Sequence, residues 1–175
     1  MCSSDLLVPW RTVLGNITLG ASLRGVRNDE VTARARQMAN DYGLGDFLSH
    51  YPRALSGGMR QRVAFMRTLA TEHDVVLLDE PFGALDAQTR FAMQTWITEV
   101  WRDTGRTIVF ITHDVDEALF LSDRVVVFSP RPGRIVDDID VDIARPRSVA
   151  TLTTPTFMEL KQRILTTLHH PEDGR

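Results

Sequence analysis

Apolar residues between positions 12 and 70 recur at helical spacing, interrupted by glycine and proline. Over residues 29–42 they fall three and four positions apart, which predicts one buried face of a helix. Pro52 breaks the short piece that follows. Ser56 then stands where a helix N-cap is expected, ahead of a helical pattern over residues 59–69. The first part of the chain is therefore predicted to be helical.

The pattern changes after residue 74. Three short apolar runs, Val75–Leu78, Thr107–Ile111 and Val125–Phe128, have the length of strands and lack polar alternation. Strands of this kind are typically buried on both faces of a parallel sheet that helices cover. Helical segments over residues 86–103 and 115–121 separate the runs. Strands that alternate with helices predict an α/β fold.

Two further elements follow. Residues 134–141 alternate apolar side chains with aspartates, which predicts a surface strand or hairpin arm. Residues 154–168 carry apolar side chains on one side and predict a terminal amphipathic helix. The expected organisation is a helical part with an atypical start over residues 1–72, an α/β part over 73–142, and a C-terminal linker and helix over 143–175.

Composition narrows the class of protein. The chain has 175 residues and a formal net charge of −3, so it has no overall attraction for nucleic acid or an anionic membrane. It has no apolar stretch of roughly 18 residues, as a membrane helix requires, and its start does not resemble a signal peptide. A single cysteine, Cys2, fits a reducing compartment. Lys161 is the only lysine.

The first candidate site is the octet Leu55–Arg62, with the sequence LSGGMRQR. Ser56, Gly57 and Gly58 open a helix and expose backbone N–H groups at its positive end, which suits a phosphate. Gln61 adds an amide one turn later. For the serine and two glycines alone, a capped helix after a flexible turn is the plainer interpretation.

The second candidate site is the acidic pair at the end of the run Val75–Leu78. Parallel sheets bind ligands at the carboxyl ends of their strands, where Asp79 and Glu80 fall. One carboxylate can hold Mg²⁺ through water, and the next can polarise an attacking water. An isolated acidic pair is more often a helix cap or a loop, but here Pro81–Asp86 follows with the sequence PFGALD.

Together these motifs resemble the ATP-binding cassette (ABC) ATPases. The octet is similar to the family's signature motif, Asp79 and Glu80 to its Walker B motif, and Pro81–Asp86 to its D-loop. His113 follows the run Thr107–Ile111 and is similar to the family's switch histidine, which contacts the γ-phosphate. Both strands should end at the same edge of the sheet if they are parallel.

The resemblance implies a partial P-loop NTPase fold, with a mostly parallel sheet, flanking helices and a helical signature subdomain. It implies Mg²⁺ and ATP as cofactor and substrate, with residues 73–142 as a RecA-like core. The implied roles are catalysis by Glu80 and His113, metal binding by Asp79, and ATP binding by Ser56, Gly57, Gly58, Gln61 and Asp86.

Three other segments narrow the resemblance to importers. Leu6–Val13 is similar to the stretch after the family's Q-loop, and Ser122–Val125 and Ser129–Ile135 resemble the nitrate, sulfonate and taurine importer ATPases. The implied partners are permease subunits, a second ATPase subunit and, indirectly, a solute-binding protein, with no nucleic acid. The implied location is the cytoplasmic face of the inner membrane. Trp10 lies where the family docks its permease, although it could equally pack inside the helical part.

One family motif is missing. The Walker A loop, G-x-x-x-x-G-K-[ST], cradles the phosphates, and Lys161 stands between Leu160 and Gln162 within a helical pattern. The start, Met1–Ser4, is unlike the family, so a truncated or misjoined start is expected. We therefore expect an importer ATPase that is inactive as this chain alone. The alternatives are an ABC ATPase without a transporter and a non-catalytic module that pairs with an intact subunit.

Overall fold

A computed structural model describes residues 7–25, 29–71, 73–83 and 85–169. The expectations for Cys2, Leu6, Ala84 and the start of the chain lie outside these ranges. The chain forms two compact units. The first consists of residues up to Met93 with Trp101–Ile111, and the second of Gln94–Val100 with the residues from Thr112 onward. The predicted boundaries after residues 72 and 142 stay predictions.

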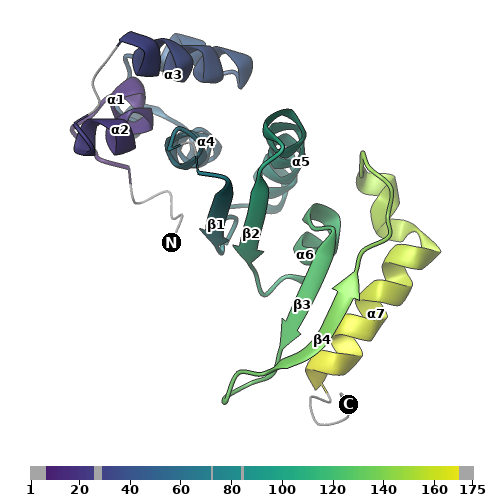
Figure 1. The fold of residues 1–175 in the computed structure, drawn as a ribbon. Helices are drawn as coiled ribbons and strands as arrows, with labels where there is room; N and C mark the ends of the chain where they lie inside the picture. The colour runs from purple at the N-terminus through teal and green to yellow at the C-terminus, as the bar shows by residue number, and fades with distance from the viewer. Residues whose placement is uncertain (1–6, 26–28, 72, 84, 170–175) are drawn as a thin grey trace. The chain divides into compact units, whose positions relative to one another are not determined.

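The first unit begins with the predicted helices (Figure 1). They are α1 (Val13–Ile17), α2 (Leu19–Leu23), α3 (Asp29–Asp41) and α4 (Gly57–Leu69), with 3-10 turns at Gly45–Phe47 and Pro52–Ala54. Helix α1 packs against α3 and α4. The buried side chains of these helices include Val13, Ile17, Ala35, Ala39, Val63, Phe65 and Met66. The helical character expected for this part of the chain is confirmed.

The strands β1 (Val75–Asp79) and β2 (Thr107–Ile111) are parallel, with Val75 opposite Thr107 and Asp79 opposite Ile111. Helix α5 (Ala87–Thr104) connects them, so the predicted strand–helix–strand unit is confirmed (Figure 1). Burial on both faces is wrong for this sheet. Exposure alternates along β1, where Val76 and Leu78 are buried while Val75 is 52% and Leu77 72% exposed. Within the part of the chain that the structure describes, one face of the two-stranded sheet is covered and the other is exposed.

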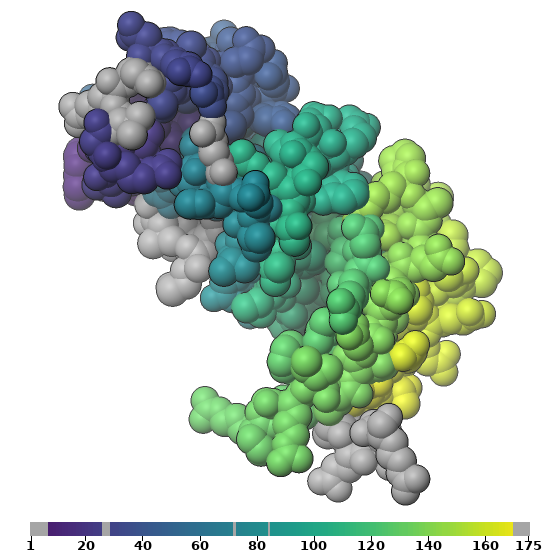
Figure 2. Space-filling view, viewed as in Figure 1, coloured from purple at the N-terminus to yellow at the C-terminus, as the bar shows by residue number. Residues whose placement is uncertain are grey.

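The second unit contains α6 (Val115–Leu121), β3 (Arg124–Phe128), β4 (Ile135–Asp140), a 3-10 turn at Val149–Thr153 and α7 (Pro155–His169). Strand β3 pairs antiparallel with β4, and its place in the parallel sheet stays a prediction. The antiparallel pairing follows from the short connection, because a few residues can join antiparallel neighbours but not parallel ones. The hairpin arm expected over residues 134–141 is confirmed, and Figure 2 shows the turn after β3 projecting from its unit.

The core of this unit lies between the hairpin, α6 and α7, and its buried members are Leu119, Val127, Ile139, Val141, Phe157 and Ile164. An arginine is buried beside it. The guanidinium of Arg147 donates to five backbone carbonyls at 2.7–3.4 Å. Three of them lie around the end of α6 (Leu119, Phe120 and Ser122), and two lie after β4 (Val141 and Ile143). Burial lowers the pKa of Arg147 to about 10, so the side chain stays charged at neutral pH.

Candidate functional site

The signature segment forms the start of α4. Ser56 is the N-cap, and its Oγ accepts a hydrogen bond from the N–H of Met59 at 3.2 Å. Gly57 and Gly58 are the first two helical residues, and Ser56 is exposed. The first four N–H groups of a helix have no partner within the helix, and the helix dipole adds partial positive charge there. The predicted N-cap is confirmed, and this helix end has the chemistry to bind a phosphate.

Gln61 lies on the buried side of the same helix. Its side chain is only 3% exposed, and its Nε2 donates a hydrogen bond to the carbonyl oxygen of Pro81. This bond joins the signature helix to the loop that follows β1. The structure thus shows a linking contact for Gln61, and the contact with a phosphate stays a prediction. Periodicity alone could not find this contact, because its two residues are 20 positions apart.

The acidic pair lies at the carboxyl end of β1. Asp79 is the last residue of the strand, and Glu80 follows with a φ of 43°. The N–H of Glu80 donates to the carbonyl of Ile111 at 2.9 Å, which extends the β1–β2 ladder by one bond. A non-glycine residue in this region of φ costs about 1–3 kcal/mol, and such residues cluster at functional sites. Glu80 is the one described non-glycine residue with positive φ, and both acids are exposed.

Asp86 caps the next helix. Its carboxylate accepts hydrogen bonds from the N–H groups of Gln88 and Thr89, both at 3.1 Å. Hydrogen bonding by the Thr89 side chain and N–H lowers the pKa of Asp86. This N-cap position accounts for Asp86 locally, and its contact with nucleotide stays a prediction.

The starts of α4 and α5 approach each other closely. A Cβ atom on Gly58 would lie 2.9 Å from Cγ2 of Thr89, whereas a Cβ on Gly57 would meet its nearest neighbour, Arg60, at 4.0 Å. Thr89 is β-branched and also bonds to Asp86, so its side chain has little freedom to move away. Gly58 is therefore required by the packing of the signature helix against the D-loop helix.

His113 belongs to the second unit, two residues beyond the end of β2. Its side chain is exposed, and its chain neighbours Thr112 and Asp114 are both held by hydrogen bonds at the start of α6. The other predicted site residues all belong to the first unit. The grouping of His113 with Glu80 around one phosphate stays a prediction.

The position of Asp79 is suited to the magnesium ion that the sequence analysis predicts. Among the described residues, no three histidine, cysteine or acidic side chains gather closely enough to hold a metal ion. Mg²⁺ commonly uses only one or two carboxylates and completes its octahedron with water and substrate phosphates. An exposed carboxylate at the carboxyl end of a parallel strand is consistent with that mode of binding.

Trp10 is a surface residue, with 78% of its side chain exposed, so its packing inside the helical part is wrong. The turn that carries Trp10 is held by the buried side chain of Asn16. Asn16 is fully buried, accepts from the N–H of Val8 at 2.8 Å, and donates to the carbonyls of Val8, Arg11 and Thr12 at 3.0–3.1 Å. The sequence analysis missed Asn16, because one asparagine within a helical pattern is no signal by itself.

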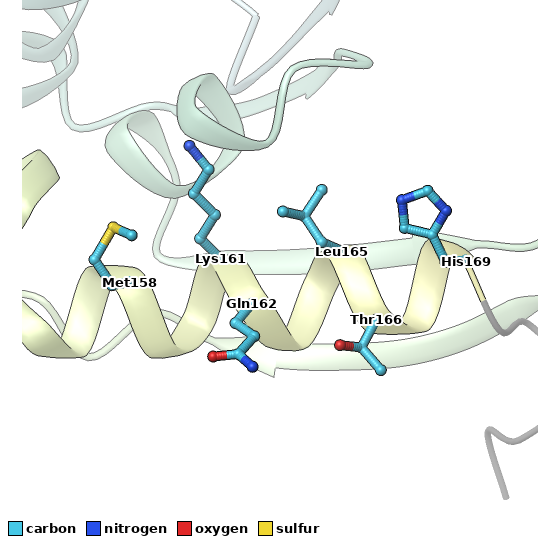
Figure 3. A pocket seen from close by; sticks show the side chains of 6 residues that line it. All are labelled: Met158, Lys161, Gln162, Leu165, Thr166 and His169. Carbon is cyan, nitrogen blue, oxygen red and sulfur yellow. The ribbon is translucent and has the colours of Figure 1, made fainter.

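A hollow of about 560 Å³ lies along α7 in the second unit. Figure 3 shows its lining side chains along this one helix: Met158, Lys161, Gln162, Leu165, Thr166 and His169. Lys161 points toward α6 and pairs with Asp116, with Nζ 2.7 Å from Oδ1. None of the predicted site residues lines this hollow. Lys161 has a structural contact within a helix, as expected for a lysine outside a phosphate loop.

The sequence of the chain is similar to those of known ABC transporter proteins. The family model described as ABC transporter matches residues 2–83. A taurine import ATP-binding protein of Rhizobium johnstonii is 45% identical over 98% of this chain and 67% of its own length. An uncharacterised ABC transporter ATP-binding protein of Methanocaldococcus jannaschii is 48% identical over 93% of this chain and 60% of its own length. A taurine import ATP-binding protein of Pseudomonas aeruginosa is 45% identical over 92% and 63%.

The chain belongs to the ABC transporter ATP-binding family. The expected fold class is confirmed, an α/β domain with a parallel pair of strands, flanking helices and a helical signature segment. The chain spans between 60% and 67% of the length of these three curated relatives. No described helix is both long and apolar enough to cross a membrane.

Proposed function

We propose that the chain is part of the ATP-hydrolysing subunit of an ABC importer that drives uptake of a small sulfonate such as taurine. The observation that carries the proposal is the end of β1, where Glu80 follows Asp79 in a left-handed backbone conformation bonded to the end of β2. The signature helix is tied to the same loop through Gln61 and Pro81. The solute class rests on two relatives that are named as taurine import proteins.

In this proposal, each site residue of the chain has a distinct role. Glu80 orients and polarises the attacking water as general base, a role that contributes about 10²–10⁴-fold in rate. Ser56, Gly57 and Gly58 present N–H groups and a hydroxyl to the phosphates of ATP. His113 contacts the γ-phosphate. Mg²⁺, held by Asp79, would offset negative charge on the phosphates.

A chimera tests the assignment of Glu80. A segment that carries a Walker A loop, taken from an intact ABC ATPase, is joined ahead of this chain. Glu80→Gln should then lower turnover by about 10²–10⁴-fold and leave ATP binding intact. Glu159→Gln, an exposed acid on α7, is the matched control and should keep full turnover. A Glu80→Gln chimera with more than half of the parent's turnover would contradict the role.

The 175-residue chain by itself should not bind MgATP measurably, because its sequence contains no G-x-x-x-x-G-K-[ST] loop to cradle the phosphates. A titration with a fluorescent ATP analogue measures this. Saturable binding with turnover above a buffer control would refute it. If the chain lacks turnover yet increases that of an intact relative when mixed with it, the alternative of a non-catalytic partner module is supported instead.

We also propose that the subunit works at the cytoplasmic face of the membrane, as one of two ATPase subunits on the permeases, with a solute-binding protein acting indirectly and no nucleic acid involved. Trp10 is the proposed permease contact, because exposed tryptophan is frequent among interface hot spots. In the chimera, Trp10→Ala should weaken co-purification with the permease and leave the melting temperature unchanged. Leu23→Ala, equally exposed at 78%, is the control and should retain binding.

A further inference from the structure

The loop that carries His113 is held by hydrogen bonds at the start of α6. The hydroxyl of Thr112 donates to Oε2 of Glu117 at 2.8 Å and accepts from the N–H of Asp114 at 3.0 Å. One hydroxyl therefore serves both a side chain on the helix and the backbone beyond His113. The hydrogen-bonded residues stand immediately before and after the histidine.

The second half of the arrangement is the N-cap. Oδ1 of Asp114 accepts hydrogen bonds from the N–H groups of Asp116 at 2.9 Å and Glu117 at 3.1 Å. In an ordinary capping box, the acidic residue at the third helical position reaches back to the N–H of the N-cap residue itself. Here Glu117 occupies that position, but the N–H of Asp114 goes to Thr112, and Thr112 goes to Glu117. The box is extended through a hydroxyl to a residue ahead of His113.

The anchor of this extended box is well fixed. Glu117 is only 5% exposed, whereas His113 is exposed. Helix α6 is held by the buried side chains of Leu119 and Phe120 and packs against α7. A simple cap would leave the peptide before His113 without a link to the helix. The link through Thr112 transfers the rigidity of the buried helix to both sides of the exposed histidine.

We propose that Glu117 is a positioning residue for His113 and acts through the hydroxyl of Thr112. The inference rests on the proposed function, in which His113 contacts the γ-phosphate. Phosphoryl transfer is catalysed mainly by positioning and charge stabilisation, and a displacement of about 1 Å can cost about 10²-fold in rate. A histidine on an exposed loop can hold such a position only if its backbone is fixed on both sides.

The test measures His113 directly in the 175-residue chain and needs no ATP turnover. The ring of His113 is observed by NMR after ¹³C labelling of the histidines, with His50 and His169 as internal references. Thr112→Val removes the hydroxyl at nearly constant volume and should shift and broaden the His113 signal while the two reference signals stay in place. Thr112→Ser keeps the hydroxyl and should restore the native His113 signal.

A second pair of variants separates positioning from stability. Glu117→Gln keeps an acceptor oxygen for Thr112 and should leave His113 nearly native, whereas Glu117→Met keeps the volume, removes the acceptor and should reproduce the effect of Thr112→Val. Asp116→Asn, on the same turn of helix, weakens the pair with Lys161 and should leave the His113 signal unchanged. The proposal is overturned if the His113 signal is native in Thr112→Val. If Thr112→Val does not fold, a native His113 signal in folded Glu117→Met overturns it instead.

The NMR result for His113 and the proposed ATPase function can fail separately. A loss of the native His113 signal supports the positioning role whether or not the chimera hydrolyses ATP. An active chimera that tolerates Glu80→Gln contradicts the assignment of the general base and leaves the His113 result as it stands. In the chimera, Thr112→Val should lower kcat more than it raises KM, because it displaces a group that acts in the transition state. Equal turnover in this variant and the parent would contradict the catalytic consequence.

Discussion

Replacing Arg147 with methionine should destabilise the second unit by about 3 kcal/mol. The substitution keeps a long, flexible apolar stem but removes the hydrogen bonds of the guanidinium to five carbonyls, of which that of Val141 keeps a second donor, the N–H of Ile143. Leu119 and Phe120 lie in the last turn of α6, both are buried, and Arg147 donates to both of their carbonyls. A hydrogen bond from a charged group contributes about 1.5–3 kcal/mol.

The magnitude follows from two opposing contributions. The buried carbonyls of Leu119 and Phe120 each lose a charged donor at about 1.5–3 kcal/mol, and the less buried carbonyls of Ser122 and Ile143 lose about 0.5–1.5 kcal/mol each, so the losses come to about 4–9 kcal/mol. Removing the buried charge recovers part of this. Burial, with the nearby charge of Arg145, lowers the pKa of Arg147 to about 10, and this shift corresponds to about 3 kcal/mol that an uncharged methionine does not lose. The lost hydrogen bonds therefore outweigh the recovered desolvation, by about 3 kcal/mol.

Urea unfolding followed by circular dichroism measures the loss, and amide hydrogen exchange at the end of α6 shows whether the loosening is local. Arg163→Met is the control, because the Arg163 side chain is 53% exposed and a surface pair contributes about 0.2–1 kcal/mol. Arg147→Lys should fall between the two, since an ammonium group cannot reach carbonyls on both sides as the guanidinium fork does. A loss below about 1 kcal/mol in Arg147→Met, with unchanged exchange in α6, would refute the reasoning.

Three further predictions concern packing, charge and the turn that carries the exposed tryptophan. Gly58→Ala should lower the melting temperature while Gly57→Ala leaves it unchanged or raises it, because only the first meets a side chain at 2.9 Å; equal melting temperatures would contradict this. Arg163 lowers the pKa of Asp137, so its stabilisation is present above the ordinary value of 3.8 and is lost as the pH falls through the lower folded value. The difference in melting temperature between the native chain and Arg163→Met should therefore be larger at pH 6 than at pH 2.5, and a constant difference would exclude the pair as its source. Asn16→Ala should lower stability by about 2 kcal/mol in urea unfolding, since the fully buried side chain loses its hydrogen bonds to Val8, Arg11 and Thr12, and a loss near zero would show that water replaces the side chain.

Much of the fold could be predicted because local spacing records it. The apolar face of α3, the cap at Ser56 and the breaks at glycine and proline all depend on residues a few positions apart. The parallel pairing of β1 with β2 also followed, because a helix of the right length connects two apolar runs. The signature and the acidic pair were found for the same reason, as their chemistry is contained in consecutive residues.

Other features were decided only by the tertiary structure. Gln61 bonds to Pro81, Gly58 approaches Thr89, and Arg147 bonds to carbonyls more than 20 positions away around the end of α6. No periodicity records such partners, because each one depends on how separate elements pack. Strand β3 shows the same limit: its apolar run suits either parallel or antiparallel pairing, and only the short turn makes its pair with β4 antiparallel. The sequence by itself determined which residues could perform the chemistry, and packing determined which of them hold the others in place.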